Sequence, residues 1–240
     1  MKHVKINAFD CPDAWYKTLS EIWQKGEIFK VGYGSEATET KKLNLSIEIE
    51  HPENRPLVHE KAPCDMNYLY TYTLRYLWSE LIEEGETYTY GSRLRKPIDQ
   101  IAEAVKRYVD ERNDRQVTLV IRRPEDILKE IDGKKHEPPC LTMIDTEISD
   151  NKLHLTCYFR SWDAYAGLPA NIAGIQLLNE AIVKEINELG NDRYSNWENI
   201  STGKLIFHSK NCHIYERQYK LIEELFKANS KTHMQRIKNL

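Results

Sequence analysis

Residues 43–50, LNLSIEIE, alternate apolar and polar side chains with a period of two, and this pattern is the strongest constraint on the fold. Such alternation predicts a strand that is buried on one face. Residues 141–148 and 153–159 flank the turn-rich SDNK and predict a hairpin. Further strands are predicted at 117–121, 204–209 and 212–215. The chain therefore needs a sheet and a layer that covers it.

Helical periodicity is predicted in four segments, which are 66–84, 97–112, 171–189 and 216–228. Pro97 suits a first helical turn, and Gly190 follows the third segment as a typical C-cap residue. The aromatic stretch 67–78, NYLYTYTLRYLW, is expected in the core or at a subunit interface. Strands and helices show no regular βαβ order and no linker divides the chain. We therefore expect one α+β domain over residues 1–240 with a mixed or largely antiparallel sheet.

The composition excludes several classes of protein. Of the 240 residues, 40% are hydrophobic and 30% are charged, which is typical of neither a disordered nor a membrane-spanning chain. The net charge of -3 provides no basic field, so a nucleic-acid partner is not expected. No signal peptide is visible, and the five cysteines are widely spaced without a C-x-x-C pair. We expect a cytoplasmic protein without a disulfide framework or zinc finger.

Cys140 directly follows two prolines in HEPPCL, at the start of a predicted strand. Pro138 and Pro139 bias the backbone away from helix and would present the thiol rigidly. A buried free cysteine is more often a small inert hydrophobe. Two interpretations of Cys140 therefore stay open, a nucleophile and a core residue.

The segment 159–174, FRSWDAYAGLPANIAG, joins a predicted strand to a predicted helix. Arg160 and Ser161 suit a phosphate, because a guanidinium binds two oxygens and a hydroxyl adds a short hydrogen bond. Asn171 opens the helix, where it would serve as an N-cap or pair with a pyrimidine edge. A charged strand end followed by a loop and a capped helix is the alternative that needs no ligand.

The segment 211–218, NCHIYERQ, contains two polar rings that a strand would place on one face, His213 and Tyr215. Such a pair can hold a sugar hydroxyl. A histidine satisfied within the fold and a surface tyrosine are the alternative.

Together the three segments resemble the thymidylate synthase family. The resemblance rests on PPC at 138–140, RS-x-D-xxx-G-x-P-x-N at 160–171 and HIY at 213–215, and YTYGSRLR at 88–95 resembles the family's Y-G-x-x-x-R segment. It covers roughly residues 88–219, while the amino-terminal part is divergent and the short length is similar to the archaeal-type branch. It implies an α+β domain whose mixed sheet is packed by helices, with a sheet face at a dimer interface. It also implies a methyltransferase that converts dUMP to dTMP with a methylene-tetrahydropterin and no metal.

The resemblance implies roles for the matched residues around the nucleotide. Cys140 would add to C6 of the pyrimidine and so make C5 nucleophilic, and the nearby Arg160 would favour the reactive thiolate. Arg160 and Ser161 would hold the 5′-phosphate, and Asn171 would read the N3/O4 edge of uracil. The residues implied for the ribose 3′-hydroxyl are His213 and Tyr215.

The resemblance also implies roles outside the nucleotide contacts. Asp163 and Gly167 would line the pterin site and its water network, and Tyr90 would support proton transfer from C5. Arg115 matches the first arginine of a pair that reaches the phosphate from the other subunit of a homodimer. Gln116 stands at the second position, so one of those charges is absent.

The sequence departs from the family pattern at several positions. Leu141 stands where the family usually has histidine, Phe159 where glutamine is common, and Ala170 where phenylalanine contacts the folate. We expect either 5,10-methylenetetrahydrofolate or, because of these changes, a methylene-tetrahydromethanopterin as the carbon donor. Residues 34–42 offer no match for the family's amino-terminal phosphate arginine. Candidates for its catalytic glutamate are Glu80, Glu83 and Glu84.

Three alternatives remain beside this reading. A hydroxymethylase acting on dCMP or CMP would use the same adduct, although Asn171 favours uracil. A catalytically silent nucleotide- or RNA-binding protein would keep the fold without the chemistry. A metal site could be built from Cys140, Cys157, Cys212 and His213, although their spacing fits no common zinc pattern.

Overall fold

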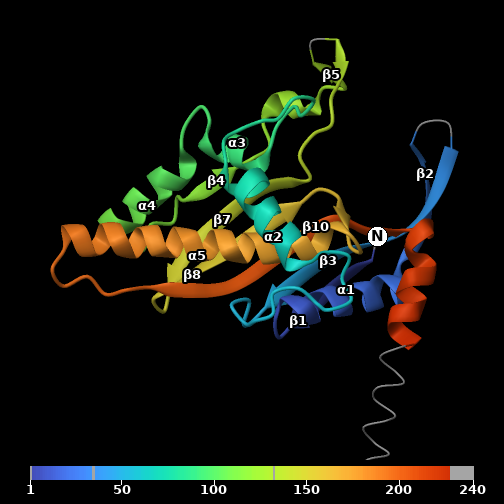
Figure 1. Ribbon diagram of the computed structural model, residues 1–240, viewed down its shortest axis with the longest axis horizontal. Helices are drawn as coiled ribbons and strands as arrows, with labels where there is room; N and C mark the ends of the chain where they lie inside the picture. Colours follow the sequence, from blue (N-terminus) through green and yellow to red (C-terminus); the bar gives the residue numbers. More distant parts are fainter. Residues whose placement is uncertain (1, 34–35, 132, 228–240) are drawn as a thin grey trace, which may run out of the picture.

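The structure is a computed structural model that describes residues 2–33, 36–131 and 133–227 (Figure 1). The α-helices are α1 (Cys11–Lys25), α2 (Met66–Tyr72), α3 (Tyr90–Arg95), α4 (Gln100–Asp110) and α5 (Gly167–Arg193), and a further helix spans 219–227. The shorter helical turns are the π-helix η1 (Thr73–Trp78) and the 3-10 helices η2 (Pro124–Ile127) and η3 (Glu216–Gln218). The strands are β1 (His3–Ala8), β2 (Glu27–Tyr33), β3 (Glu36–Ile49), β4 (Thr118–Val120), β5 (Glu130–Ile131), β6 (Lys134–Lys135), β7 (Leu141–Ser149), β8 (Lys152–Phe159), β9 (Trp162–Asp163) and β10 (Ser201–Tyr215).

One mixed sheet forms the centre of the molecule. Its strand order is β1-β3-β10-β8-β7-β4, with β2 paired to β3 and β9 paired to β10. The central strand β10 runs antiparallel to β3 and parallel to β8, and β7 and β8 form the predicted hairpin. The α+β class with a mixed sheet is therefore confirmed. No helix in the described part of the chain is both long and apolar enough to cross a membrane.

The helices cover one face of this sheet. Figure 1 shows α5 lying along the strands, with α2 crossing over it and α1 beside it over β1 and β3. Along β8, the side chains of Leu155, Cys157 and Phe159 are fully buried, whereas Thr156 and Tyr158 between them are only half-buried. The alternation continues along β10. The second face thus carries half-buried, partly polar side chains, and its place at a dimer interface stays a prediction.

The core lies between α5, α1 and the covered face of the sheet, and its aromatic centre reaches the end of β9. Trp162 stacks on Phe159 with ring centroids 4.2 Å apart and lies 5.4 Å from the ring of Phe207. All three rings are almost fully buried. Burial of one such side chain stabilises a fold by roughly 2–3 kcal/mol. The segment that follows β8 is therefore held rigidly at the strand ends.

The predicted strands 204–209 and 212–215 form a single strand, β10, which extends from Ser201 to Tyr215. Its pairing with β3 shifts register between Ser209 and Cys212, where the residues Lys210 and Asn211 interrupt the apolar pattern. A local irregularity of this kind disturbs the period of two without ending the strand. His213 and Tyr215 nevertheless keep one face, as predicted.

Two predicted helices have wrong boundaries. The predicted helix over 66–84 ends at Trp78, because the backbone of Ser79 is extended. The Ser79 carbonyl oxygen packs closely against Gly91 of α3, where an added Cβ would lie only 2.2 Å from it. Close packing against α3, and not a local breaker, ends this helix. The predicted helix over 171–189 begins earlier, at Gly167, so Asn171 is not its N-cap, and it continues past Gly190 to Arg193. Gly190 is required there because a Cβ would lie 2.3 Å from the Trp197 ring.

The other predicted helices begin and end close to the expected positions. The segment 97–112 contains α4, which begins after Asp99, whose carboxylate accepts a hydrogen bond from the backbone N–H of Ala102 at 3.0 Å. The tail begins with the 3-10 turn η3 and becomes α-helical over 219–227, while position 228 lies outside the described residues.

Candidate functional site

A cavity of about 830 Å³ opens where the end of β8, the strand β9 and the carboxyl end of β10 meet the segment before β7. Its lining residues are Thr38, Tyr88, His136, Glu137, Pro138, Cys140, Arg160, Ser161, Trp162, Asp163, His213, Tyr215 and Arg217. Three motifs that lie far apart in the sequence meet here. The predicted site residues that the cavity brings together are Cys140, Arg160, Ser161, Asp163, His213 and Tyr215.

Cys140 is half-buried at the cavity wall, immediately before β7. Its carbonyl oxygen accepts a hydrogen bond from the backbone N–H of Arg160 at 2.9 Å, which joins the cysteine segment to the end of β8. Burial raises the pKa of the Cys140 thiol, Arg160 lowers it, and Glu137 raises it further. Arg160 therefore favours the thiolate as expected, but burial outweighs it and the thiol pKa lies above its ordinary value.

The guanidinium of Arg160 is fixed by the two prolines before Cys140. Its Nε donates to the Pro139 carbonyl oxygen at 2.9 Å, and one Nη donates to the Pro138 carbonyl oxygen at 2.6 Å. Prolines supply carbonyl acceptors but no N–H donors. Two of the five guanidinium N–H groups are used in this way, which leaves three for a ligand. The two prolines before Cys140 thus hold the Arg160 guanidinium in a fixed orientation.

Asp163 organises the turn between β9 and α5. Its Oδ1 accepts hydrogen bonds from the backbone N–H groups of Tyr165 and Ala166 at 3.0 and 3.1 Å. The side-chain amide of Gln218 donates to the same carboxylate at 3.1–3.2 Å, while Gln218 Oε1 accepts from the backbone N–H of Tyr215 at 2.8 Å. Gln218 is buried, so this amide ties the end of β10 to the turn before α5.

Asn171 is half-buried in the first turns of α5 and is not among the residues that line the cavity. Its Oδ1 accepts from Trp162 Nε1 at 2.8 Å, and its Nδ2 donates to the Tyr72 hydroxyl at 2.7 Å. The indole can only donate, so it fixes the orientation of the amide. One N–H and one oxygen lone pair of Asn171 remain, which is the capacity that a uracil edge requires.

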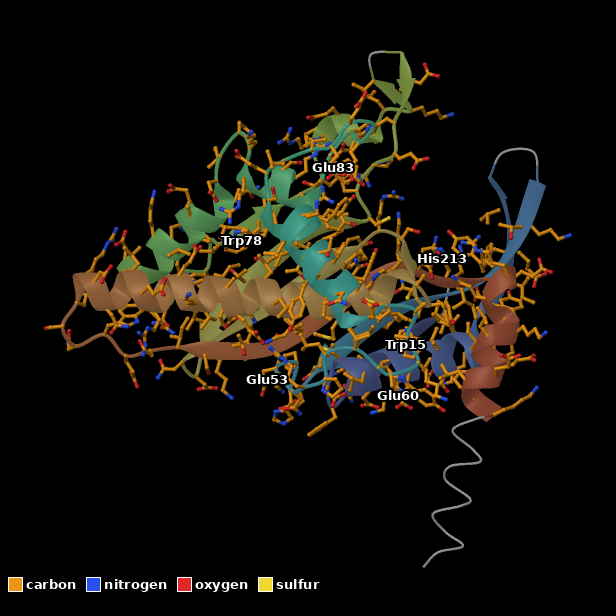
Figure 2. All side chains as sticks on the ribbon, in the orientation of Figure 1. Trp15, Glu53, Glu60, Trp78, Glu83 and His213 are labelled. Carbon is orange, nitrogen blue, oxygen red and sulfur yellow. The ribbon has the colours of Figure 1, made fainter. Side chains whose placement is uncertain are left out.

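His213 and Tyr215 lie at the carboxyl end of β10. Their rings meet edge to face with centroids 4.8 Å apart, and His213 Nδ1 lies 3.2 Å from the Asn211 carbonyl oxygen. Burial lowers the pKa of His213, while the Asn211 carbonyl and Asp163 raise it. His213 is therefore neutral near pH 7 and can both donate and accept a hydrogen bond. Figure 2 shows His213 near the amino end of α5.

A cluster of four tyrosines, Tyr72, Tyr76, Tyr88 and Tyr90, lies behind Cys140, and Tyr88 reaches the cavity itself. Burial raises the pKa of all four phenols, and a negative charge on Cys140 raises each of them further. These hydroxyls therefore stay protonated and can donate hydrogen bonds at neutral pH.

Besides Asn171, three predicted site residues do not line the cavity. Tyr90 lies behind its wall, where its hydroxyl accepts a hydrogen bond from the backbone N–H of Leu141 at 3.3 Å. Gly167 begins α5, and a Cβ there would lie 3.6 Å from Asn171 Oδ1. Arg115 is exposed in the loop between α4 and β4. The roles predicted for these residues stay predictions.

The candidate catalytic glutamates also lie outside the cavity lining. Glu80 pairs with Lys96, and Glu83 pairs with Arg75. Figure 2 shows Glu83 well separated from His213. Glu84 is exposed in the same loop. The glutamate at the cavity is Glu137, which sequence reasoning did not single out although it lies three residues before Cys140.

His136 is a second cavity residue that the motifs did not indicate. Its Nε2 lies 2.9 Å from Asp126 Oδ1, and Arg93 donates to the same oxygen at 2.9 Å. Asp126 is almost fully buried, so its charge is balanced inside the fold. A histidine before the PPC motif was the available signal, but its partners come from distant segments.

The metal site considered from Cys140, Cys157, Cys212 and His213 has no support in the described residues, among which no three metal-ligating side chains form a group that could hold an ion. Cys157 and Cys212 are fully buried in the sheet.

Comparisons with known proteins agree with the motifs. The family model described as "Thymidylate synthase" matches residues 22–238. A protein of Methanococcoides burtonii named "Putative thymidylate synthase" is 30% identical, with 93% of this chain and 94% of the relative covered. A protein of the same name from Methanothermobacter thermautotrophicus is 27% identical, with 92% and 98% covered. A protein of Francisella philomiragia named "Thymidylate synthase" is 26% identical, with 93% and 81% covered.

Proposed function

Because this chain belongs to the thymidylate synthase family, we propose that it converts dUMP to dTMP by reductive methylation with a methylene-tetrahydropterin. Cys140 would form a transient covalent bond to C6 of the uracil ring. The donor would be 5,10-methylenetetrahydrofolate or a methylene-tetrahydromethanopterin. No metal is needed for this chemistry.

One observation carries the proposal, namely that a half-buried thiol, an oriented guanidinium and a hydroxyl share one cavity. Cys140, Arg160 and Ser161 all line it, and the proline carbonyls hold Arg160 in place. A phosphate bound by Arg160 and Ser161 would anchor the nucleotide, and this remote binding energy would position the ring against the thiol. A core role for Cys140 would not require this arrangement.

Addition of the thiolate to C6 pushes negative charge onto O4, so the reaction needs donors that face the ring. The remaining N–H of Asn171 and the protonated hydroxyl of Tyr88 would supply them, directly or through water. Removal of one such donor costs an enzyme about 3 kcal/mol of transition-state stabilisation. Neutral His213 and Tyr215 would hold the ribose 3′-hydroxyl.

A homodimer belongs to the same proposal. Arg115 is exposed and lies outside the cavity lining of its own chain, so it would act on the phosphate of the other subunit. The half-buried, partly polar face of the sheet offers a surface for the second copy. Arg115→Gln should then weaken dUMP binding, and an unchanged affinity would remove the cross-subunit role.

The test is release of tritium from C5-labelled dUMP and C5-labelled dCMP, each assayed with both pterins. We expect release from dUMP that depends on a methylene-tetrahydropterin and yields dTMP. Preference for dCMP with a hydroxymethyl product would favour a hydroxymethylase instead. Full efficiency with methylenetetrahydrofolate would contradict the choice of a modified pterin.

A second measurement separates catalysis from binding alone. The 5-fluoro analogue of dUMP, incubated with protein and pterin, should give a covalent complex that mass spectrometry assigns to Cys140. Binding of dUMP without any such adduct would support a catalytically silent nucleotide-binding protein.

A further inference from the structure

Arg217 is a cation in the cavity that no sequence motif indicated. It belongs to the 3-10 turn η3 directly after β10, and its side chain is exposed. It lines the cavity together with Arg160, Ser161 and Tyr215. The position is held by a cation–π contact, in which the guanidinium carbon lies 4.2 Å from the centroid of the Tyr215 ring.

This contact leaves the edge of the guanidinium available. A guanidinium that stacks on an aromatic ring uses its face, so its N–H groups remain free to bind an anion. No carboxylate among the described residues forms an ion pair with Arg217. The nearby carboxylate of Asp163 is already bound by Gln218 and by the backbone N–H groups of the turn before α5.

The charges in the cavity identify the kind of group that Arg217 would bind. Arg160 has already given two of its five N–H groups to the proline carbonyls. A nucleotide monophosphate brings a dianion with three terminal oxygens, which Arg160 and Ser161 cannot satisfy alone.

Neighbouring residues place Arg217 on the nucleotide side. Tyr215, on which it stacks, and His213 are the residues predicted to hold the ribose, and the positive charge of Arg217 contributes to the lowered pKa of His213. Thr38, on the strand β3 that pairs with this end of β10, lines the same cavity.

We propose that Arg217 binds the 5′-phosphate of the nucleotide, as a second guanidinium that this chain supplies within its own subunit. The inference rests on the proposed function and extends it, because it names a specificity residue for the monophosphate. Arg217 would discriminate a nucleotide from a nucleoside and would not act on the reacting atoms.

Isothermal titration of the full chain with dUMP and with deoxyuridine tests the proposal. The variants are Arg217→Gln, Arg217→Lys and the control Lys220→Gln, which removes an exposed cation outside the cavity lining. We expect Arg217→Gln to weaken dUMP binding about tenfold or more, since a hydrogen bond to a charged group is lost. Deoxyuridine binding should change less than twofold, Arg217→Lys should recover part of the affinity, and Lys220→Gln should match the wild type.

Each other result overturns the inference in a recognisable way. Equal dUMP affinity in Arg217→Gln and wild type removes the phosphate role and leaves the proposed function intact. An equal loss for dUMP and deoxyuridine assigns Arg217 to the sugar or to local folding, which the midpoint of thermal unfolding also reports. Failure of the wild type to bind dUMP removes both proposals.

Discussion

Cys140 and Cys157 belong to the same hairpin, but their thiols lie in very different environments. Cys157 points into the covered face of the sheet from the middle of β8, is fully buried, and has a pKa that burial alone raises far above its ordinary value. Cys140 lies at the edge of the same sheet, is half-buried, and has a guanidinium beside it. Reactivity requires the thiolate and access to solvent, so of these two thiols Cys140 is the candidate for a reactive one.

The difference comes from the neighbouring residues and not from the strand itself. Ile144 pairs with Cys157 across the hairpin, in the interior of the sheet. Cys140 stands one residue before β7, where two prolines keep the chain from extending the strand and expose their carbonyl oxygens to Arg160. A shift of a few residues along one hairpin therefore separates a core residue from a candidate nucleophile.

The largest expected effect comes from removing the reactive sulfur. Cys140→Ser should lower the rate of dTMP formation by about 10⁴-fold or more, because a hydroxyl ionises far less readily than a thiol and is a much weaker nucleophile. It should also abolish the covalent complex with the 5-fluoro analogue in mass spectrometry. Cys157→Ala is the matched control and should keep the complex. An adduct that persists in Cys140→Ser would remove the proposed nucleophile.

The second-largest expected effect is the pH dependence of alkylation, which should differ between Cys140 and Cys157. Burial raises the pKa of the Cys140 thiol above its ordinary value, so the thiolate is a minor species at pH 7 and its fraction increases as the pH rises. Modification of Cys140 by iodoacetamide should accelerate more than about tenfold between pH 7 and pH 9. Peptide mapping should find Cys157 unmodified in the folded protein at both pH values. A rate at Cys140 that is flat over this range would contradict a raised pKa.

Arg160 accounts for a smaller part of the difference. Arg160→Gln removes the cation that lowers the pKa of Cys140, so that pKa should rise and the thiolate fraction at pH 8 should fall. We expect the alkylation of Cys140 to be slower by about severalfold, because a smaller fraction of the thiol is then ionised. Arg160→Lys keeps the positive charge but loses the planar guanidinium that binds both proline carbonyls. Its alkylation rate should lie between those of the wild type and Arg160→Gln. Faster alkylation in Arg160→Gln would mean that opening of the proline segment outweighs the charge.

The smallest effect should be on stability. Cys157→Ala removes one buried sulfur from the core and should lower the free energy of unfolding by about 1 kcal/mol, the cost of a methyl-sized cavity. Denaturant unfolding followed by circular dichroism measures this. Cys140→Ala, at a half-buried position, should cost less. A larger loss for Cys140→Ala would show that this residue belongs to the core.

Sequence periodicity was sufficient where burial itself alternates. The strand over 43–50 and the hairpin over 141–159 follow from side chains that are buried on one face only. Periodicity failed where tertiary contacts set the boundary, as at Ser79, whose extended conformation depends on close packing with Gly91. The helix α1 was missed although Asp10 and Pro12 are local start signals, with the Asp10 carboxylate accepting from the Asp13 N–H.

The candidate site divides in the same way. Short sequence motifs were sufficient to predict Cys140, Arg160 and His213 as site residues, because each lies at the end of a strand and its motif marks that position. Arg217 could not be found by spacing, since its position depends on stacking across Tyr215 at the end of β10. Tyr72 reaches Asn171 from a separate helix, 99 residues earlier in the chain. Contacts of that kind depend on how helices pack, which periodicity does not encode.

The buried amide of Gln218 has a practical consequence for protein engineering. It donates to the carboxylate of Asp163 and accepts from the backbone N–H of Tyr215, so it links the turn before the last helix to two residues that line the cavity. Truncation of the protein after Tyr215 would remove Gln218 and, with it, these hydrogen bonds. Tags and fusion partners should therefore be attached beyond the helix 219–227, where they would leave the hydrogen bonds of Gln218 intact.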